Sequence, residues 1–179
     1  MTLSLMNLVH RFFNNSRKNG NGNGLSHEKE SAVLLAQGSG TGATVLFVDD
    51  ELSILKIRRL VFETLGYSVL TAISGEEALA VLKMHQVDAV VLDYLMPGMD
   101  GEETARRIRE LRCNIPIILS TGCLLVPESL LEVVTAAVEK GAKPEALIEV
   151  LEEQLSLCSR ANSPASLMLE TQGRQATES

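Results

Sequence analysis

Carboxylate side chains gather at two places in the sequence, each directly after an apolar run. In the stretch VLFVDDE, Asp49 and Asp50 follow four apolar residues, and Asp93 ends the similar stretch VVLD. Carboxylates that lie close together repel, and the pKa of at least one rises unless a cation joins them. Mg²⁺ prefers oxygen ligands and is commonly bound by one or two carboxylates together with a phosphate oxygen. The three aspartates therefore predict a magnesium site that can also bind a phosphoryl group.

Two further residues complete the pattern expected for phosphoryl transfer. Thr121 ends the apolar stretch IPIILST, and Lys143 follows the last apolar run that has the length of a strand. A hydroxyl and an ammonium group at these places would help to neutralise the charge on the equatorial oxygens of a phosphoryl group. Asp93 stands alone at the end of its run, so we expect it to be the nucleophile. The pair Asp49 and Asp50 is better placed to hold the metal.

Strand-like and helical patterns alternate between residues 43 and 158. Short, continuous apolar runs are typical of strands buried on both faces, and apolar residues three and four apart are typical of helices. Ser74 with Glu77, and Asp100 with Glu103, match the capping pattern at the start of two helices. The strands are expected at residues 44–48, 67–72, 88–93, 115–121 and 137–140, and the helices at residues 54–65, 75–85, 101–112, 128–136 and 144–155.

This alternation predicts an α/β fold, a flavodoxin-like doubly wound five-stranded parallel sheet of order 2-1-3-4-5 with helices on both faces. Ligands of such sheets bind beyond the carboxyl ends of the strands, where the winding reverses. The first and third strands are neighbours in this order, so the side chains of Asp49, Asp50 and Asp93 should converge. One aspartate at a strand end is usually a helix cap or a solvated loop residue. The complete set in order at successive strand ends favours a phosphoryl site.

The charge is unevenly distributed along the chain, with a net of +2 for residues 1–42, −9 for residues 43–158 and zero for residues 159–179. An acidic body offers phosphates no basic face, which argues against nucleic acid as a partner. No run approaches the roughly 18 apolar residues of a membrane span, so no integral membrane segment is expected. The three cysteines lack metal-site spacing and cannot all pair, which favours a cytoplasmic location.

The composition divides the chain into three parts. Residues 1–42 are expected to be a flexible arm and linker, residues 43–158 one folded domain, and residues 159–179 a disordered tail. About 20 residues after the last helix are too few for an output domain. Together with Met1 and the long preface, this favours a complete short protein that acts without an output domain.

At this point the sequence resembles the receiver domain of bacterial response regulators, the CheY-like domain of two-component systems. The resemblance lies in VDDE after the first strand, DYLMPGMDG after the third, ST after the fourth and KP after the fifth. The intervals are also those of the family, with 43 residues from Asp50 to Asp93, 28 to Thr121 and 22 to Lys143. The resemblance covers residues 43–158.

The resemblance implies that Asp93 accepts a phosphoryl group from a histidine kinase or a phosphotransfer protein. Thr121 and Lys143 would contact that group, and their rearrangement would signal to an unknown downstream protein through the face of the fourth helix, fifth strand and fifth helix. It implies a switch that modifies itself, not an enzyme that turns over a separate substrate. It also implies a Mg²⁺ site whose ligands are Asp50, Asp93, the backbone carbonyl of Leu95 and, through water, Asp49.

Two positions depart from the family pattern. The family commonly has an aromatic residue three positions before the lysine, and Lys140 stands at that position here. Leu95 stands two residues after Asp93, beside the expected phosphoryl group. An apolar side chain there cannot guide the attacking water, so we expect a longer-lived phosphoryl state than a polar residue would give.

Two alternatives remain open from the sequence. A degenerate receiver used only for docking is left open by Lys140 but opposed by the complete acidic set and Lys143. A Mg²⁺-dependent phosphohydrolase with an aspartyl nucleophile would tend to place a general acid two residues after Asp93, where this chain has Leu95.

Overall fold

The computed structural model describes residues 42–122 and 126–161. Residues 1–41 of the predicted arm and residues 162–179 of the predicted tail therefore lie outside the described residues. The elements, in chain order, are β1 (Thr44–Val48), α3 (Leu52–Thr64), β2 (Ser68–Ala72), α4 (Gly75–Met84), β3 (Ala89–Asp93), α5 (Gly101–Leu111), β4 (Ile117–Thr121), α6 (Glu128–Leu131), β5 (Ala136–Glu139) and α7 (Pro144–Ala161).

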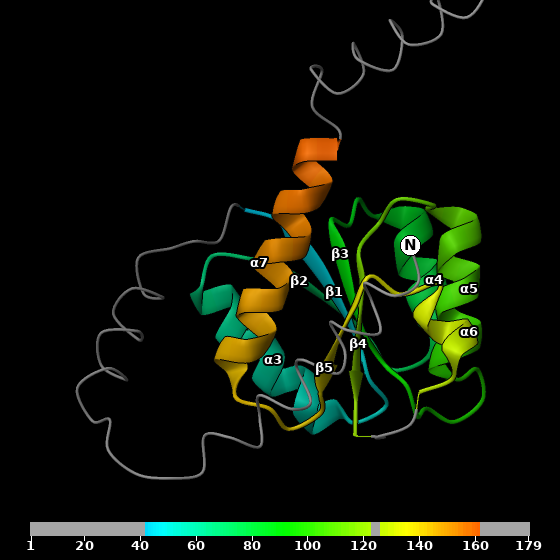
Figure 1. The fold of residues 1–179 in the computed structure, drawn as a ribbon. Helices are drawn as coiled ribbons and strands as arrows, with labels where there is room; N and C mark the ends of the chain where they lie inside the picture. The colour runs from blue at the N-terminus through cyan, green and yellow to red at the C-terminus, as the bar shows by residue number, and fades with distance from the viewer. Residues whose placement is uncertain (1–41, 123–125, 162–179) are drawn as a thin grey trace, which may run out of the picture.

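The five strands form one parallel sheet of order β2-β1-β3-β4-β5, as predicted. The helices cover both of its faces, with α3 and α7 on one side and α4, α5 and α6 on the other (Figure 1). Because every crossover runs through a helix, the carboxyl ends of all five strands point to the same edge of the sheet. That edge is where the predicted site residues lie.

Each strand contributes to two apolar cores because successive side chains point to opposite faces. In β1, Leu46 and Val48 pack with residues of α4 and α5, whereas Val45 and Phe47 pack with residues of α3 and α7. This explains why the strands read as continuous apolar runs and not as alternating ones. Within the described residues, no helix has the length and apolarity needed to cross a membrane.

The two predicted helix caps are present. The side chain of Ser74 accepts a hydrogen bond from the backbone N–H of Glu77 at 3.2 Å, and that of Asp100 accepts one from Glu103 at 2.9 Å. Each bond satisfies a backbone donor that has no partner within its helix. The second cap fixes the start of α5, directly after the loop that follows Asp93.

The helix predicted over residues 128–136 is wrong in length, because α6 ends at Leu131. The next residues are held in another way, by a bond from Arg109 Nε to the carbonyl of Val133 at 2.7 Å. The backbone N–H of Thr135 also donates to the carbonyl of Ile117 at 2.8 Å. Because of these contacts, the residues after α6 pack against the sheet and do not continue the helix, and β5 begins at Ala136.

Gly101 allows α5 to begin against the backbone of the β3–α5 loop. A Cβ atom there would lie 2.5 Å from the carbonyl oxygen of Asp93 and 2.7 Å from the Cα of Tyr94. We expect Gly101→Ala to lower the free energy of unfolding by about 1 to 3 kcal/mol, although alanine is normally favoured in a helix. Chemical denaturation of this variant beside Gly122→Ala tests it, since a Cβ at Gly122 meets no atom within 4 Å. Equal stability of the two variants would contradict the close approach.

Candidate functional site

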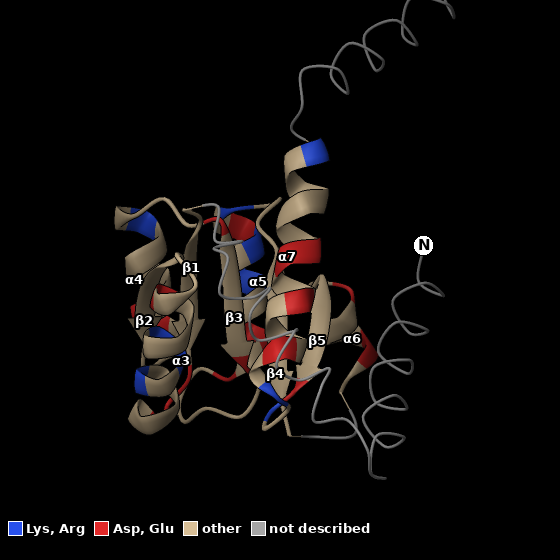
Figure 2. Ribbon diagram, turned by 90° about the vertical axis from the view of Figure 1, so that its left-hand side faces the viewer, with Lys and Arg blue, Asp and Glu red and all other residues tan. Residues whose placement is uncertain are grey.

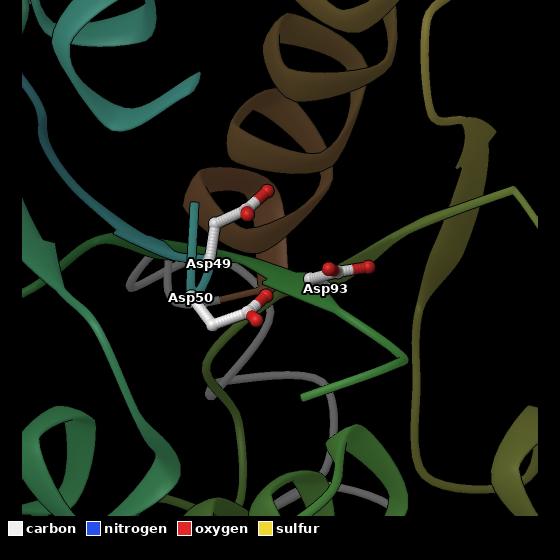
Figure 3. A group of neighbouring side chains, drawn as sticks. All are labelled: Asp49, Asp50 and Asp93. Carbon is white, nitrogen blue, oxygen red and sulfur yellow. The ribbon is translucent and has the colours of Figure 1, made fainter. Parts of the chain in front are cut away.

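Three carboxylates meet at the carboxyl edge of the sheet. Asp49 and Asp50 follow β1 and Asp93 ends β3, and one oxygen of each lies within 4.8 Å of the others (Figure 3). The register places Val48 beside Leu92, which brings the ends of the two strands to one level. The predicted convergence of these aspartates is confirmed. Asp49 and Asp93 are buried, whereas Asp50 is exposed to solvent.

Asp49 is the most constrained of the three. Burial raises its pKa, and the charge of Asp93 adds to the rise. The backbone N–H of Glu51, which donates to Asp49 Oδ1 at 3.0 Å, and the charge of Lys140 act in the opposite direction but do not cancel it. Asp49 Oδ2 is buried and accepts no hydrogen bond from the described residues. A cation at this edge would relieve both the burial and the repulsion.

Lys140 supplies a positive charge to this cluster. Its Nζ lies 2.5 Å from Asp93 Oδ2, 3.3 Å from Asp49 Oδ1 and 3.1 Å from Glu51 Oε1. Burial by itself would lower the pKa of Lys140, but the hydrogen bonds to Asp93 and Glu51 and the nearby carboxylate charges outweigh it and raise the pKa. The ammonium group therefore stays charged at neutral pH, 2.5 Å from the predicted nucleophile.

The other predicted site residues lie around this cluster. Thr121 is buried at the end of β4, one position beyond Ser120, the residue that pairs with Asp93. Leu95 lies in the loop after β3 with 62% of its surface exposed, two residues from the nucleophile. Their contacts with a phosphoryl group and with a metal stay predictions.

The arrangement of acidic residues, lysine and threonine at the edge of a 2-1-3-4-5 sheet is matched by a known domain. The sequence profile of the response regulator receiver domain matches residues 45–152. The chain belongs to the response regulator receiver family. It is therefore a receiver of the two-component type.

Relatives of this receiver include both whole regulators and isolated receiver structures. It is 43% identical over 98 residues to the probable transcriptional regulator ycf27 of Cyanidium caldarium, covering 55% of this chain and 37% of that protein. It is 35% identical over 118 residues to the response regulator MprA of Mycobacterium sp. (strain KMS), covering 66% of this chain and 51% of that protein. The receiver thus spans about half or less of these curated relatives.

Two solved structures resemble it over nearly their whole length. The CheY-like receiver from Methanospirillum hungatei JF-1 has a TM-score of 0.64 at 26% identity, covering 67% of this chain and 98% of that one. The response regulator TrrA from Thermotoga maritima was solved in complex with Mg²⁺-BeF. It has a TM-score of 0.59 at 32% identity, covering 63% of this chain and 98% of that one.

The lysine beside Asp93 is Lys140, whereas the sequence predicted Lys143 for this role. With Lys140 as the lysine of the family pattern, Lys140 no longer occupies the aromatic position. Lys140 lies 19 positions after Thr121, against the 22 positions expected for Lys143, and the single-turn α6 makes the shorter connection possible. The backbone N–H of Lys140 donates to the carbonyl of Thr121 at 2.9 Å, which places this lysine directly beyond β5.

This correction also moves the aromatic position. The residue three positions before Lys140 is Ala137, which is buried in β5. Neither assignment of the lysine puts an aromatic side chain there, so the departure from the family pattern persists. The signal that favours Lys140 was present in the sequence, since it directly follows the run AAVE, whereas Gly141 and Ala142 separate that run from Lys143.

Arg58 is a charged residue of the site that the sequence analysis missed. It lies on α3, and its Nη2 donates to Ser120 Oγ at 2.7 Å. Its Nη1 lies 3.8 Å from Asp49 Oδ2. The available signal was its spacing, because Arg58 is four residues after Ile54 and four before Phe62, on the face of the helix that packs on the sheet.

Proposed function

We propose that this receiver accepts a phosphoryl group on Asp93 from a phosphohistidine of a histidine kinase or phosphotransfer protein. One observation carries the proposal. The carboxylate of Asp93 is buried at a strand end, beside two further aspartates and 2.5 Å from the ammonium group of Lys140. This arrangement combines a nucleophile, an acidic pocket for a dication and a fixed positive charge.

The residues present fit Mg²⁺ as the cation of the site. All three clustered side chains offer carboxylate oxygens, the ligands that this hard dication prefers. Asp49 Oδ2, which accepts no hydrogen bond from the described residues, is a further acceptor at the same place. When bound, Mg²⁺ would neutralise charge on the phosphoryl oxygens. The proposed holders are Asp50, Asp93, the backbone carbonyl of Leu95 and, through water, Asp49.

In the proposed reaction an oxygen of Asp93 attacks the phosphorus of the phosphohistidine. The O–P bond of an acyl phosphate forms as the N–P bond breaks, and the imidazole nitrogen keeps the electron pair of that bond. Lys140 already pairs with the carboxylate of Asp93, and it is placed to pair with the phosphoryl oxygens once they carry the negative charge. The hydroxyl of Thr121 would donate to one of those oxygens, which draws the end of β4 towards Asp93.

We propose that the phosphorylated receiver signals through protein contacts and works in the cytoplasm. Its acidic character opposes direct contact with nucleic acid, and acidic residues recur along α7 (Figure 2). The curated relatives named above are longer, and one is named a transcriptional regulator. That this receiver acts without an output domain stays a prediction.

Incubation of the receiver with Mg²⁺ and acetyl phosphate tests the proposal. Intact-mass spectrometry should show the gain of one phosphoryl group, and EDTA should prevent it. Steady phosphate release over many turnovers would support the phosphohydrolase alternative instead. A protein that gains no mass yet binds a partner would support the docking-only alternative.

We expect Leu95→Asn to shorten the lifetime of the phosphoryl group. An asparagine amide beside Asp93 can orient the water that attacks phosphorus, whereas the exposed leucine side chain cannot. The rate of dephosphorylation should rise severalfold, which is a small increase for a polar group that positions a reacting water. It is measured as loss of phosphoryl mass after removal of the donor. An unchanged rate would refute the role given to Leu95.

A further inference from the structure

Arg58 places a largely buried positive charge behind the acidic cluster. Only 12% of its side chain is exposed, although it belongs to a helix whose other basic residues lie on the solvent side. Its guanidinium group lies 5.7 Å from the centre of the Phe47 ring, within the apolar core between α3 and the sheet. A charge in such a position is retained only where it has partners.

The partners of Arg58 are two residues at the carboxyl edge. It donates to Ser120 Oγ on β4 at 2.7 Å, and its Nη1 lies 3.8 Å from Asp49 Oδ2. Neither that nitrogen nor that oxygen has a hydrogen-bond partner among the described residues, so the two form an ion pair without a hydrogen bond. Burial lowers the pKa of Arg58, and the charges of Asp49 and Asp93 counter this.

Arg58 and Lys140 approach Asp49 through different oxygens. The ammonium of Lys140 reaches Oδ1 and also contacts Asp93 and Glu51, whereas Arg58 faces Oδ2. Arg58 is fixed by α3 and by Ser120, so its charge remains beside Asp49 whatever the cluster binds.

We infer that Arg58 is a positioning residue that holds Asp49 against β4 and, by its charge, weakens the binding of Mg²⁺ to this receiver. The inference rests on the proposed function, which makes Mg²⁺ the cation of the acidic cluster. A fixed guanidinium near Asp49 stabilises the cluster without metal and repels a dication that arrives there. In a partly buried site, removing one such charge changes an ion's affinity on the order of tenfold.

Isothermal titration calorimetry, in which the full chain is titrated with Mg²⁺, tests the inference. Arg58→Met removes the charge and keeps an unbranched apolar stem, and Arg58→Gln keeps a polar group on the side chain. Both should bind Mg²⁺ about tenfold more tightly than the wild type, and Arg58→Lys should restore affinity to within about threefold. The control is Arg59→Met, which removes an exposed neighbouring arginine that bonds Thr71 Oγ1, and should change the affinity less than twofold.

Thermal unfolding with and without Mg²⁺ provides the second readout. Without Mg²⁺, Arg58→Met should have a lower melting temperature than the wild type. Addition of Mg²⁺ should raise the melting temperature of the variant by more than that of the wild type. Equal or weaker Mg²⁺ affinity in both neutral variants would overturn the inference. So would neutral variants that stay unfolded even in Mg²⁺, since they would show a purely structural role. A wild type that binds no Mg²⁺ would instead overturn the proposed function.

Discussion

An Asp93→Asn protein should gain no phosphoryl mass from acetyl phosphate under conditions that phosphorylate the wild type. The amide nitrogen and oxygen of asparagine do not supply the carboxylate nucleophile, while size and burial are nearly unchanged. Asp49 and Asp50 remain in this variant, so the two aspartates that follow β1 are the same in both proteins. Intact-mass spectrometry measures the result.

The matched control is Asp100→Asn, the same chemical change seven residues further along the same loop. Asp100 caps α5 through a bond from the N–H of Glu103, and asparagine caps helices about as well as aspartate. This control should gain one phosphoryl group as the wild type does. Phosphorylation of the Asp93→Asn protein to the same extent would place the acceptor elsewhere and contradict the assignment.

Replacing Lys140 by methionine should slow phosphorylation by acetyl phosphate at least on the order of tenfold. The ammonium group lies 2.5 Å from Asp93, so its loss removes a fixed charge that would stabilise the negative oxygens of the transition state. Methionine keeps most of the length and apolar contacts of the lysine stem. The initial rate of mass gain measures the effect.

Lys143→Met is the matched control for Lys140→Met, because it makes the same change one residue before α7. We expect its rate to lie within about twofold of the wild type, because Lys143 is exposed and its charge is screened by solvent. The opposite pattern, a large loss in Lys143→Met and none in Lys140→Met, would support the original assignment over the corrected one.

The acidic half of the site could be predicted because its signal is local. Asp49, Asp50 and Asp93 each follow a continuous apolar run, and the strand order that brings them together follows from alternating strands and helices. The helix caps at Ser74 and Asp100 were visible for the same reason, since a cap and its partner lie three residues apart.

The lysine was harder to predict, although Lys140 directly follows the run AAVE, because its place depends on the length of α6 and on the register of β5. Long-range bonds from Arg109 to Val133 and from Thr135 to Ile117 set both. Arg58 was missed for a related reason. The helical pattern of α3 is read from apolar residues, and an arginine on the buried face becomes meaningful only when Asp49 and Ser120 are seen beside it.

A crystal structure of this receiver with Mg²⁺ and beryllofluoride would test the central claim most directly. We expect the beryllium to be bound to the carboxylate of Asp93, with Lys140 Nζ and the hydroxyl of Thr121 on its fluorine atoms. Mg²⁺ should lie among the oxygens of Asp50, Asp93 and the Leu95 carbonyl. A beryllofluoride group bound elsewhere, or one contacted by Lys143 with Lys140 turned away, would contradict it.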